Sequence, residues 1–329
     1  MTGSAAAVMQ VLAHHMTAKY LFVAADLGVF EVLAGGPVAS DQLRERLGVP
    51  AHSLRILLDA LVAVGFLKRN GDKYANSDVT QEVLSGDGRH DLRPVLKMWN
   101  DVVYQQWGSL GTSIREDRAA YGYEEFTPDQ LQTFTTGVGA LTTPTADALA
   151  ANYDFSRHTS LLDLGGGTGS FVMAARTRYP LLQASVLERP MSAPLTRAAL
   201  AASAAGTGVS VIEGDLLDGP IPTGHDVYLL ANILHLFSPS RNQRLLSRVR
   251  DAAPVGARML LVDFWTDSAR TEPTFAALMA GEFLLVTGEG DVYSVEQVTQ
   301  WLNDTGWRLT THQPLAMPTS LIIAEHDGM

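Results

Sequence analysis

Cysteine is absent from this chain of 329 residues, which excludes a disulfide framework and any metal site built on thiolates. Basic residues are few: 24 Lys and Arg stand against 35 Asp and Glu, for a formal net charge of −11. Nucleic-acid-binding proteins normally carry a basic surface, so this balance argues against a nucleic-acid partner. No apolar run approaches the ~18–20 residues of a membrane span, and the first residues show no signal-peptide pattern. We therefore expect a cytoplasmic protein with no membrane partner.

The order of the segments predicts an N-terminal winged-helix domain over residues 1–95. Apolar residues follow helical spacing over 9–33, shorter helices are predicted over 40–47 and 53–64, and a hairpin over 66–74. Helix, turn, helix and hairpin in this order are typical of a winged helix. The helix in the DNA-recognition position has only Arg55 as a cation, so it lacks the phosphate contacts that DNA binding needs. We expect a dimerisation domain.

Residues 96–150 are predicted to form a helical linker rich in aromatic side chains. Most of these side chains are expected to pack in the protein core. Ligand pockets, however, favour domain junctions and aromatic walls. We therefore expect a substrate pocket with contributions from Trp99, Trp107 and Phe134, joined by Met279 from a later apolar helix.

Strands and helices alternate over residues 151–329, which predicts an α/β domain with a doubly wound parallel sheet. Two final runs, separated by a proline-containing turn, predict a closing antiparallel hairpin. The expected parallel strands cover 160–164, 183–187, 209–212, 226–231 and 258–263, and the hairpin covers 308–313 and 320–325.

A glycine-rich turn follows the first of these strands. Asp163 stands two positions before Gly165, and Gly167 and Gly169 complete a G-x-G-x-G pattern. A dinucleotide-binding loop reads G-x-G-x-x-G, and its third glycine would fall at Ser170. The loop instead resembles motif I of the class I S-adenosylmethionine-dependent methyltransferases, whose cofactor has no pyrophosphate. An NAD or nucleotide site, or a turn without a ligand, are the alternatives.

Further polar residues follow the other strands, and ligands of such sheets bind outside the carboxyl ends of the strands. Glu188 lies about twenty residues beyond the last glycine, where an acid binds ribose hydroxyls. Asp215 is placed to accept from an adenine amino group, with Leu216 over the ring. After the fourth strand, Asn232 completes the predicted cofactor site and His235 falls where a side chain would reach the methyl donor.

With these residues in place, the chain resembles the small-molecule O-methyltransferase family. This family includes plant caffeate-type and hydroxyindole-type enzymes and bacterial natural-product tailoring enzymes. The resemblance implies a homodimer, S-adenosylmethionine as cofactor, a small-molecule substrate, no metal, and His235 as general base. It extends over nearly the whole chain and is carried by residues 26–31, 107–110, 163–169, 214–215 and 232–235.

Departures from the family pattern leave the acid that supports His235 open. Leu236 and Phe237 stand where the family has Asp and Trp, and Val292 stands where plant members have the supporting Glu. We take Glu282 and Asp291 as candidate catalytic residues beside His235, although Glu282 would equally suit a solvent-facing position. The acids that could replace the missing Glu are Asp263, Glu282, Glu289 and Asp291.

The predicted function is methyl transfer to oxygen on a small aromatic or polyketide-like molecule. One alternative is C-methylation of a 2-oxo acid or similar molecule with a metal bound near His235, held by partners such as Glu282, Asp291 or Asn232. Another is a catalytically silent winged-helix regulator that senses S-adenosylmethionine.

Overall fold

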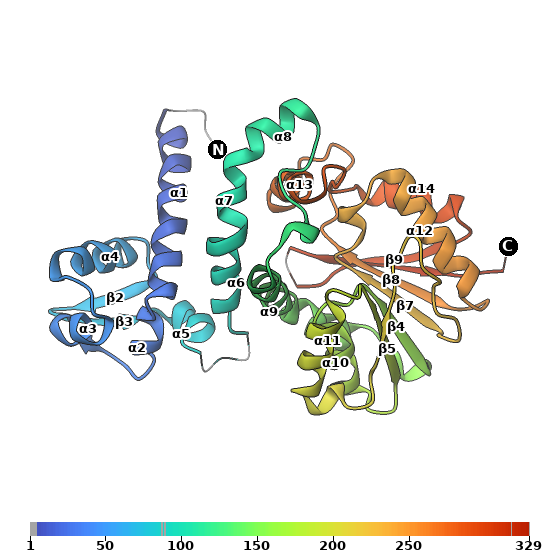
Figure 1. The fold of residues 1–329 in the computed structure, drawn as a ribbon, viewed down its shortest axis with the longest axis horizontal. Coiled ribbons are helices and arrows are strands. Elements are labelled where there is room, and N and C mark those ends of the chain that lie inside the picture. The colour runs from blue at the N-terminus through green and yellow to red at the C-terminus, as the bar shows by residue number, and fades with distance from the viewer. Residues whose placement is uncertain (1–4, 87, 89, 317, 329) are drawn as a thin grey trace. The chain divides into compact units, whose positions relative to one another are not determined.

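The computed structural model describes residues 5–86, 88, 90–316 and 318–328, and these form two compact units (Figure 1). The first unit comprises the described residues up to Gln105 together with Thr136–Leu141. The second comprises Gln106–Thr135 and the described residues from Thr142 onward. The residues expected to form a separate linker, 96–150, are thus divided between the two units.

The first unit begins with two helices where the sequence predicted one. Gly28 adopts a left-handed conformation with φ +76°, which ends the first helix and caps the second. Gly48, with φ +66°, caps the carboxyl end of α3 in the same left-handed conformation. The helices of this region are α1 (Ala5–Asp26), α2 (Val29–Val32), α3 (Ser40–Leu47), α4 (Ala51–Ala63) and α5 (Asp78–Leu84).

The predicted hairpin is formed by β2 (Leu67–Asn70) and β3 (Lys73–Asn76), which pair antiparallel. A two-residue strand, β1 (Val38–Ala39), pairs with the free side of β3 and was not predicted, because so short a run carries no alternation pattern. On α4, Arg55 pairs with Asp59 at 2.9 Å, so its charge is already compensated within the helix.

Helices continue after the hairpin as predicted, with a π-helical turn over Trp99–Val103 among them. The longest begins at a capping box, in which the Thr127 side chain accepts from the Gln130 backbone N–H and the Gln130 side chain accepts from that of Thr127. These helices are α6 (Arg93–Met98), α7 (Tyr104–Gln106), α8 (Leu110–Glu116) and α9 (Pro128–Asn152).

The second unit is built on a seven-stranded sheet of order β6-β5-β4-β7-β8-β10-β9. The first five strands in this order are mutually parallel, and β10 pairs antiparallel with both β8 and β9. The predicted α/β fold with its closing hairpin is confirmed. The strands are β4 (Ser160–Leu164), β5 (Gln183–Glu188), β6 (Ser210–Glu213), β7 (Val227–Ala231), β8 (Arg258–Asp263), β9 (Arg308–Pro314) and β10 (Ser320–Glu325).

Helices cover both faces of this sheet because successive residues of its buried central strands point to opposite sides. Leu161 and Leu229 pack with apolar residues of α10 and α11, whereas Leu162 and Tyr228 pack with those of α12 and α14. The helices of this unit beyond α9 are α10 (Ser170–Arg178), α11 (Ala193–Ala201), α12 (Pro239–Ala252), α13 (Thr274–Thr287) and α14 (Val295–Asp304).

Within the described ranges, no helix is long and apolar enough to cross a membrane.

Candidate active site

The predicted cofactor residues gather at the carboxyl ends of β4, β5, β6 and β7, on one edge of the sheet. The glycine turn leads from the end of β4 at Leu164 to the start of α10 at Ser170. The Gly165 N–H donates to the carbonyl of Leu187 at 2.8 Å, which ties the turn to the neighbouring strand β5. The sheet topology therefore places the loop and the strand-end acids beside one another, as the sequence predicted.

The three glycines of the turn have positive φ but serve different purposes. A Cβ on Gly165 would lie 2.5 Å from the side chain of Ile233, and one on Gly169 would lie 2.8 Å from Leu200, so these two permit close packing. A Cβ on Gly167, where φ is +55°, would point into open space. Gly167 is therefore the position where the backbone leaves room for a ligand.

Asp163 lies beneath this turn and is fully buried. Neither carboxylate oxygen has a hydrogen-bond partner among the described residues. Burial, with a smaller contribution from the charge of Glu188, raises the pKa of Asp163 to about 8. A buried carboxyl group without a partner is costly unless a ligand supplies the missing donors.

Glu188 and Asp215 are fixed by backbone donors at the ends of β5 and β6. Glu188 accepts from the Gly167 N–H at 2.9 Å and from the Arg189 N–H at 2.8 Å, so it is joined to the glycine turn. One oxygen of Asp215 accepts from the backbone of Leu217 at 2.7 Å and of Asp218 at 2.9 Å. Both acids keep lone pairs for the hydroxyl and amino groups of a nucleoside.

Leu216 and Asn232 complete the predicted cofactor residues. The side chain of Leu216 would lie 3.5 Å from a Cβ on Gly165, so it borders the glycine turn. Asn232 follows β7 with φ +58°, a left-handed conformation that asparagine tolerates better than most residues and that is enriched at functional sites. The site thus combines Asp163, a buried acid without a hydrogen-bond partner, with the acids Glu188 and Asp215 at the strand ends, and Gly167 leaves space beside them. This arrangement suits a cationic nucleoside such as S-adenosylmethionine.

His235 follows at the end of β7 in a short 3-10 turn and is 7% exposed. Its Nδ1 lies 2.6 Å from an oxygen of Asp263, the last residue of β8. The same oxygen accepts from the Phe264 N–H at 2.8 Å, and the other accepts from the His235 N–H at 3.4 Å. Because a carboxylate only accepts, Nδ1 carries the proton in this tautomer and Nε2 is left as the basic nitrogen.

The His235 ring is also fixed across its face. Phe283 of α13 stacks on it with ring centroids 3.7 Å apart and an interplanar angle of 10°. The ring centroid of Phe264 lies about 6 Å from those of His235 and Phe283. The imidazole is thus held by an acid along one edge and by an aromatic ring on one face.

The side chains of the other two predicted catalytic acids do not hydrogen-bond to His235, although the Asp291 backbone N–H donates to the His235 carbonyl at 3.1 Å. Glu282 is 6% exposed, and its carboxylate accepts from Trp107 Nε1 at 2.7 Å and from the Tyr121 hydroxyl at 2.6 Å. Asp291 pairs with Arg270 and accepts from the Val292 backbone N–H. The remaining alternative, Glu289, pairs with Arg241. Of the four acids that the sequence offered as support for His235, Asp263 is the one that hydrogen-bonds to its ring.

The predicted substrate residues fall in different surroundings. Trp107 contacts Glu282, and Phe134 belongs to an aromatic cluster with Tyr123 and Phe126. Met279 lies on α13, the helix that carries Glu282, and packs beside Phe283 and Val292. Trp99 lies in the π-helical turn of the first unit.

Sequence reasoning did not select Phe283 and Tyr121, and it named Asp263 only as one of four possible supporting acids. Asp263 did carry a signal, because it is an acid at the carboxyl end of a buried strand, like Glu188. Phe283 and Tyr121 are ordinary apolar or aromatic residues of helical or loop segments, and nothing in their spacing distinguishes them. In the described part of the chain, no group of three or more His, Asp or Glu side chains is arranged to hold a metal ion.

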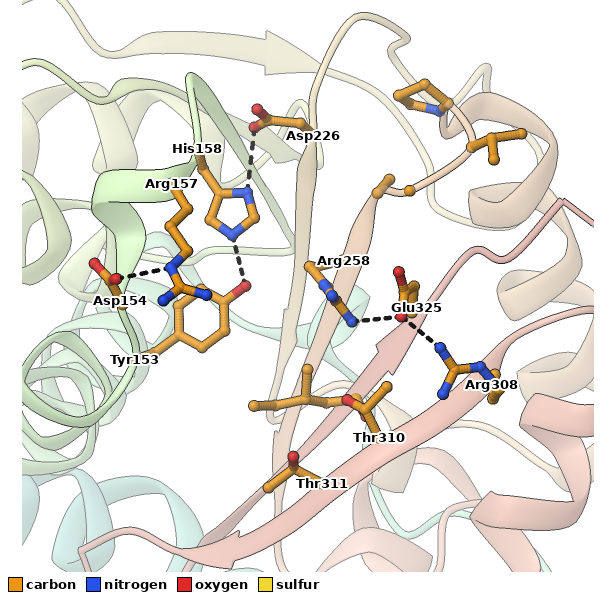
Figure 2. Close-up of a pocket in the computed structure, with 15 residues that line it drawn as sticks. Tyr153, Asp154, Arg157, His158, Asp226, Arg258, Arg308, Thr310, Thr311 and Glu325 are labelled. Atoms are coloured by element: carbon orange, nitrogen blue, oxygen red, sulfur yellow. Dashed lines mark hydrogen bonds and ion pairs between the residues drawn. The ribbon is translucent and has the colours of Figure 1, made fainter.

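A cavity of about 660 Å³ lies at the opposite edge of the sheet, by the amino ends of the strands (Figure 2). Its charged side chains pair with one another: Arg258 and Arg308 both contact Glu325, at 2.9 and 2.6 Å. His158 lies between the Tyr153 hydroxyl, at 2.8 Å, and Asp226, at 3.9 Å. The two arginines begin β8 and β9 and Glu325 ends the antiparallel strand β10, so these pairs join neighbouring strands at this edge of the sheet.

Comparison with known proteins gives the family of this chain. A family described as the O-methyltransferase domain matches residues 92–308, more than half of the chain, and one described as the O-methyltransferase dimerisation domain matches residues 9–86. The N,N-dimethyltransferase OxyT of Streptomyces rimosus is 27% identical over 317 residues, which cover 93% of this chain and 91% of OxyT.

Two further relatives agree. The tetracenomycin polyketide synthesis 8-O-methyl transferase TcmO of Streptomyces glaucescens is 26% identical over 325 residues, covering 96% of this chain and 95% of TcmO. The structure of PigF, a protein of a Serratia strain, solved with SAH, has a TM-score of 0.87 at 26% identity and covers 98% of this chain and all of PigF. The predicted cofactor, S-adenosylmethionine, is confirmed, and the chain belongs to the S-adenosylmethionine-dependent O-methyltransferase family.

Proposed function

We propose that this chain methylates a hydroxyl oxygen of a small aromatic or polyketide-type molecule, with His235 as general base. The observation that carries the proposal is the buried His235–Asp263 pair, which lies at the same sheet edge as the glycine turn. The relative TcmO is an 8-O-methyl transferase of polyketide synthesis, which supports oxygen as the acceptor atom.

Four residues of the strand ends are proposed to hold the cofactor. Gly167 leaves room for it, Asp163 offers unpartnered carboxylate oxygens, and Glu188 and Asp215 face hydroxyl and amino groups. S-adenosylmethionine supplies a methyl group activated on a positively charged sulfur, so the protein needs mainly to position the acceptor and to accept its proton.

The proton of the acceptor hydroxyl passes to Nε2 of His235. A free phenol has a pKa near 10 and a free imidazole near 6.5, so this transfer becomes favourable only as the oxygen forms its new bond. Asp263 accepts from Nδ1–H throughout, which fixes the tautomer of the neutral ring so that Nε2 faces the acceptor as the basic nitrogen, and which stabilises the imidazolium that forms. Phe283 prevents the ring from turning away.

We also propose that the protein acts as a homodimer formed by its dimerisation domain. Exposed apolar side chains on α1, among them Val8, Leu12 and Met16, support this assembly because a second copy would bury them. Sedimentation analysis should give twice the mass of one chain, 35.4 kDa, and a monomer at micromolar concentration would contradict the proposal.

The function is tested with S-adenosylmethionine labelled in its methyl group and a panel of hydroxylated naphthoates and anthraquinones. We expect labelled methyl ethers from the wild-type protein. His235→Ala should lower kcat by about 10²- to 10⁴-fold, the usual contribution of a general base, while calorimetry shows unchanged cofactor affinity. A His235→Ala variant with wild-type turnover would exclude this residue as the base.

A further inference from the structure

Glu282 is a buried acid that the proposed methyl transfer does not use. It lies on α13, is 6% exposed, and has two hydrogen-bond donors, the Trp107 indole and the Tyr121 hydroxyl. Both donors are neutral, and in the described residues it forms no ion pair with Lys, Arg or His. Burial raises the pKa of Glu282, and the two donors offset this in part.

A structural role alone does not account for a carboxylate at this position. A carboxylate has about four lone-pair directions, and the two donors use two of them. An ionised group buried without a cation is costly, and a bound cation would remove that cost. The contact with Tyr121 is buried and the contact with Trp107 is partly buried, so the Trp107 side is the less enclosed side of the carboxylate.

Aromatic rings adjoin this acid. Tyr121 stacks on Phe126 at 5.9 Å, and Tyr123 and Phe134 complete the cluster with centroid distances of 5.2–5.7 Å. Such rings favour a planar ligand, and their faces attract a cation. The cluster is defined here as Tyr121, Tyr123, Phe126 and Phe134.

This cluster contacts Glu282 through Tyr121 and the residue next to Glu188 through Tyr123. The guanidinium of Arg189, the residue after Glu188, lies over the Tyr123 ring at 5.2 Å from its centroid and pairs with Glu124 at 3.1 Å. On α13, the residue after Glu282 is Phe283, whose ring stacks on His235. The helix that carries the acid therefore also carries the ring that fixes the proposed base.

We propose that Glu282 is a specificity-determining residue that binds a protonated amine on the acceptor molecule, with the aromatic cluster holding the acceptor's ring. The inference rests on the proposed function, which makes this region the acceptor pocket. It names the substrate class: an aromatic hydroxyl compound that carries a basic amine away from the methylated oxygen.

The test compares tyramine with 4-ethylphenol, which share a phenol but differ in the ammonium group. Binding of each to the full-length protein with S-adenosylhomocysteine present is measured by calorimetry and by Trp fluorescence. We expect tyramine to bind at least about tenfold more tightly to the wild type. Glu282→Gln should abolish this preference and leave S-adenosylhomocysteine affinity unchanged. Glu289→Gln is the matched control, because that acid already pairs with Arg241.

Equal binding of the two phenols to the wild type, binding of neither, or a preference retained in Glu282→Gln would overturn the inference. If Glu282→Gln does not fold, Tyr121→Phe replaces it: this variant keeps the carboxylate and removes one neutral donor, so the preference for tyramine should persist, and its loss would overturn the inference. The readout is binding and needs no turnover, so its failure is distinct from a failure of the methyl-transfer assay.

Discussion

Replacement of Asp263 by Asn gives the sharpest test of the proposed base. The carboxylate is 1% exposed and accepts from His235 Nδ1 at 2.6 Å and from the Phe264 N–H at 2.8 Å. Asn keeps the shape of the side chain but can present its amide N–H₂ to Nδ1, which would move the imidazole proton to Nε2 and leave no base facing the acceptor.

The size of the effect follows from the bond that is lost. A buried hydrogen bond to a charged group contributes about 1.5–3 kcal/mol, and it strengthens as the imidazolium forms. At about 1.4 kcal/mol for each factor of ten, loss of this bond alone should lower kcat by roughly ten- to 150-fold, and movement of the proton to Nε2 should bring the fall toward that of His235→Ala. The KM for S-adenosylmethionine should stay near the wild-type value, because Asp263 is not among the residues proposed to hold the cofactor.

Two assays check this prediction. Turnover is measured with the best acceptor from the labelled-methyl screen, and the tautomer of His235 is read from imidazole ¹⁵N shifts of selectively labelled protein. Asp291→Asn is the matched control, because that acid pairs with Arg270 and should change kcat by less than about twofold. Wild-type kcat in Asp263→Asn, with the Nδ1–H tautomer retained, would refute the role given to this acid.

Three further outcomes are expected. Gly167→Ala should weaken S-adenosylmethionine binding at least about tenfold by calorimetry, whereas Gly208→Ala, also at positive φ with open space before its Cβ, should cost only the backbone strain of about 1–2 kcal/mol. Asp226 accepts from the Thr159 N–H and hydroxyl at 2.8 and 3.0 Å, and hydrogen bonding holds its pKa below the usual range although burial opposes this. Asp226→Asn should therefore lower the free energy of unfolding by roughly 1.5–3 kcal/mol at neutral pH in urea titrations, and the difference from the wild type should shrink as pH falls through the lowered pKa. The pKa of Asp163 is raised to about 8, so its folded form keeps a proton that the unfolded chain loses, and stability falls as pH rises from about 4 to 8. Asp163→Asn should remove that fall in the cofactor-free protein and still weaken cofactor binding; an unchanged pH profile of unfolding would contradict the raised pKa.

The fold was predictable because its main signals are local. Short apolar runs marked the five parallel strands, and the structure confirms them to within a residue or two at each end. The break between α1 and α2 was not predicted, since Gly28 lies within an apolar stretch that reads as one helix and its positive φ is visible only in three dimensions. The insertion of β10 between β8 and β9 is likewise a property of the folded sheet.

The acids around the base show where sequence reasoning ends. Asp263, Glu282, Glu289 and Asp291 are equally plausible when only their order along the chain is known. Their surroundings decide the matter: two of them pair with arginines, one meets neutral donors, and one contacts the histidine. The alternative that Glu282 faces solvent is wrong, because Glu282 is buried and the exposed side of α13 carries Phe275 and Leu278 instead.

The confinement of His235 has a consequence for regioselectivity. With Asp263 on Nδ1 and the Phe283 ring against its face, the imidazole has one free nitrogen and one direction in which to use it. If His235 is the base, then on an acceptor with several hydroxyl groups the position that is methylated depends on which oxygen can reach Nε2, and not on which hydroxyl is most acidic. A polyphenol should then yield a single methyl ether, even where a less hindered or more acidic oxygen is available elsewhere on the same ring.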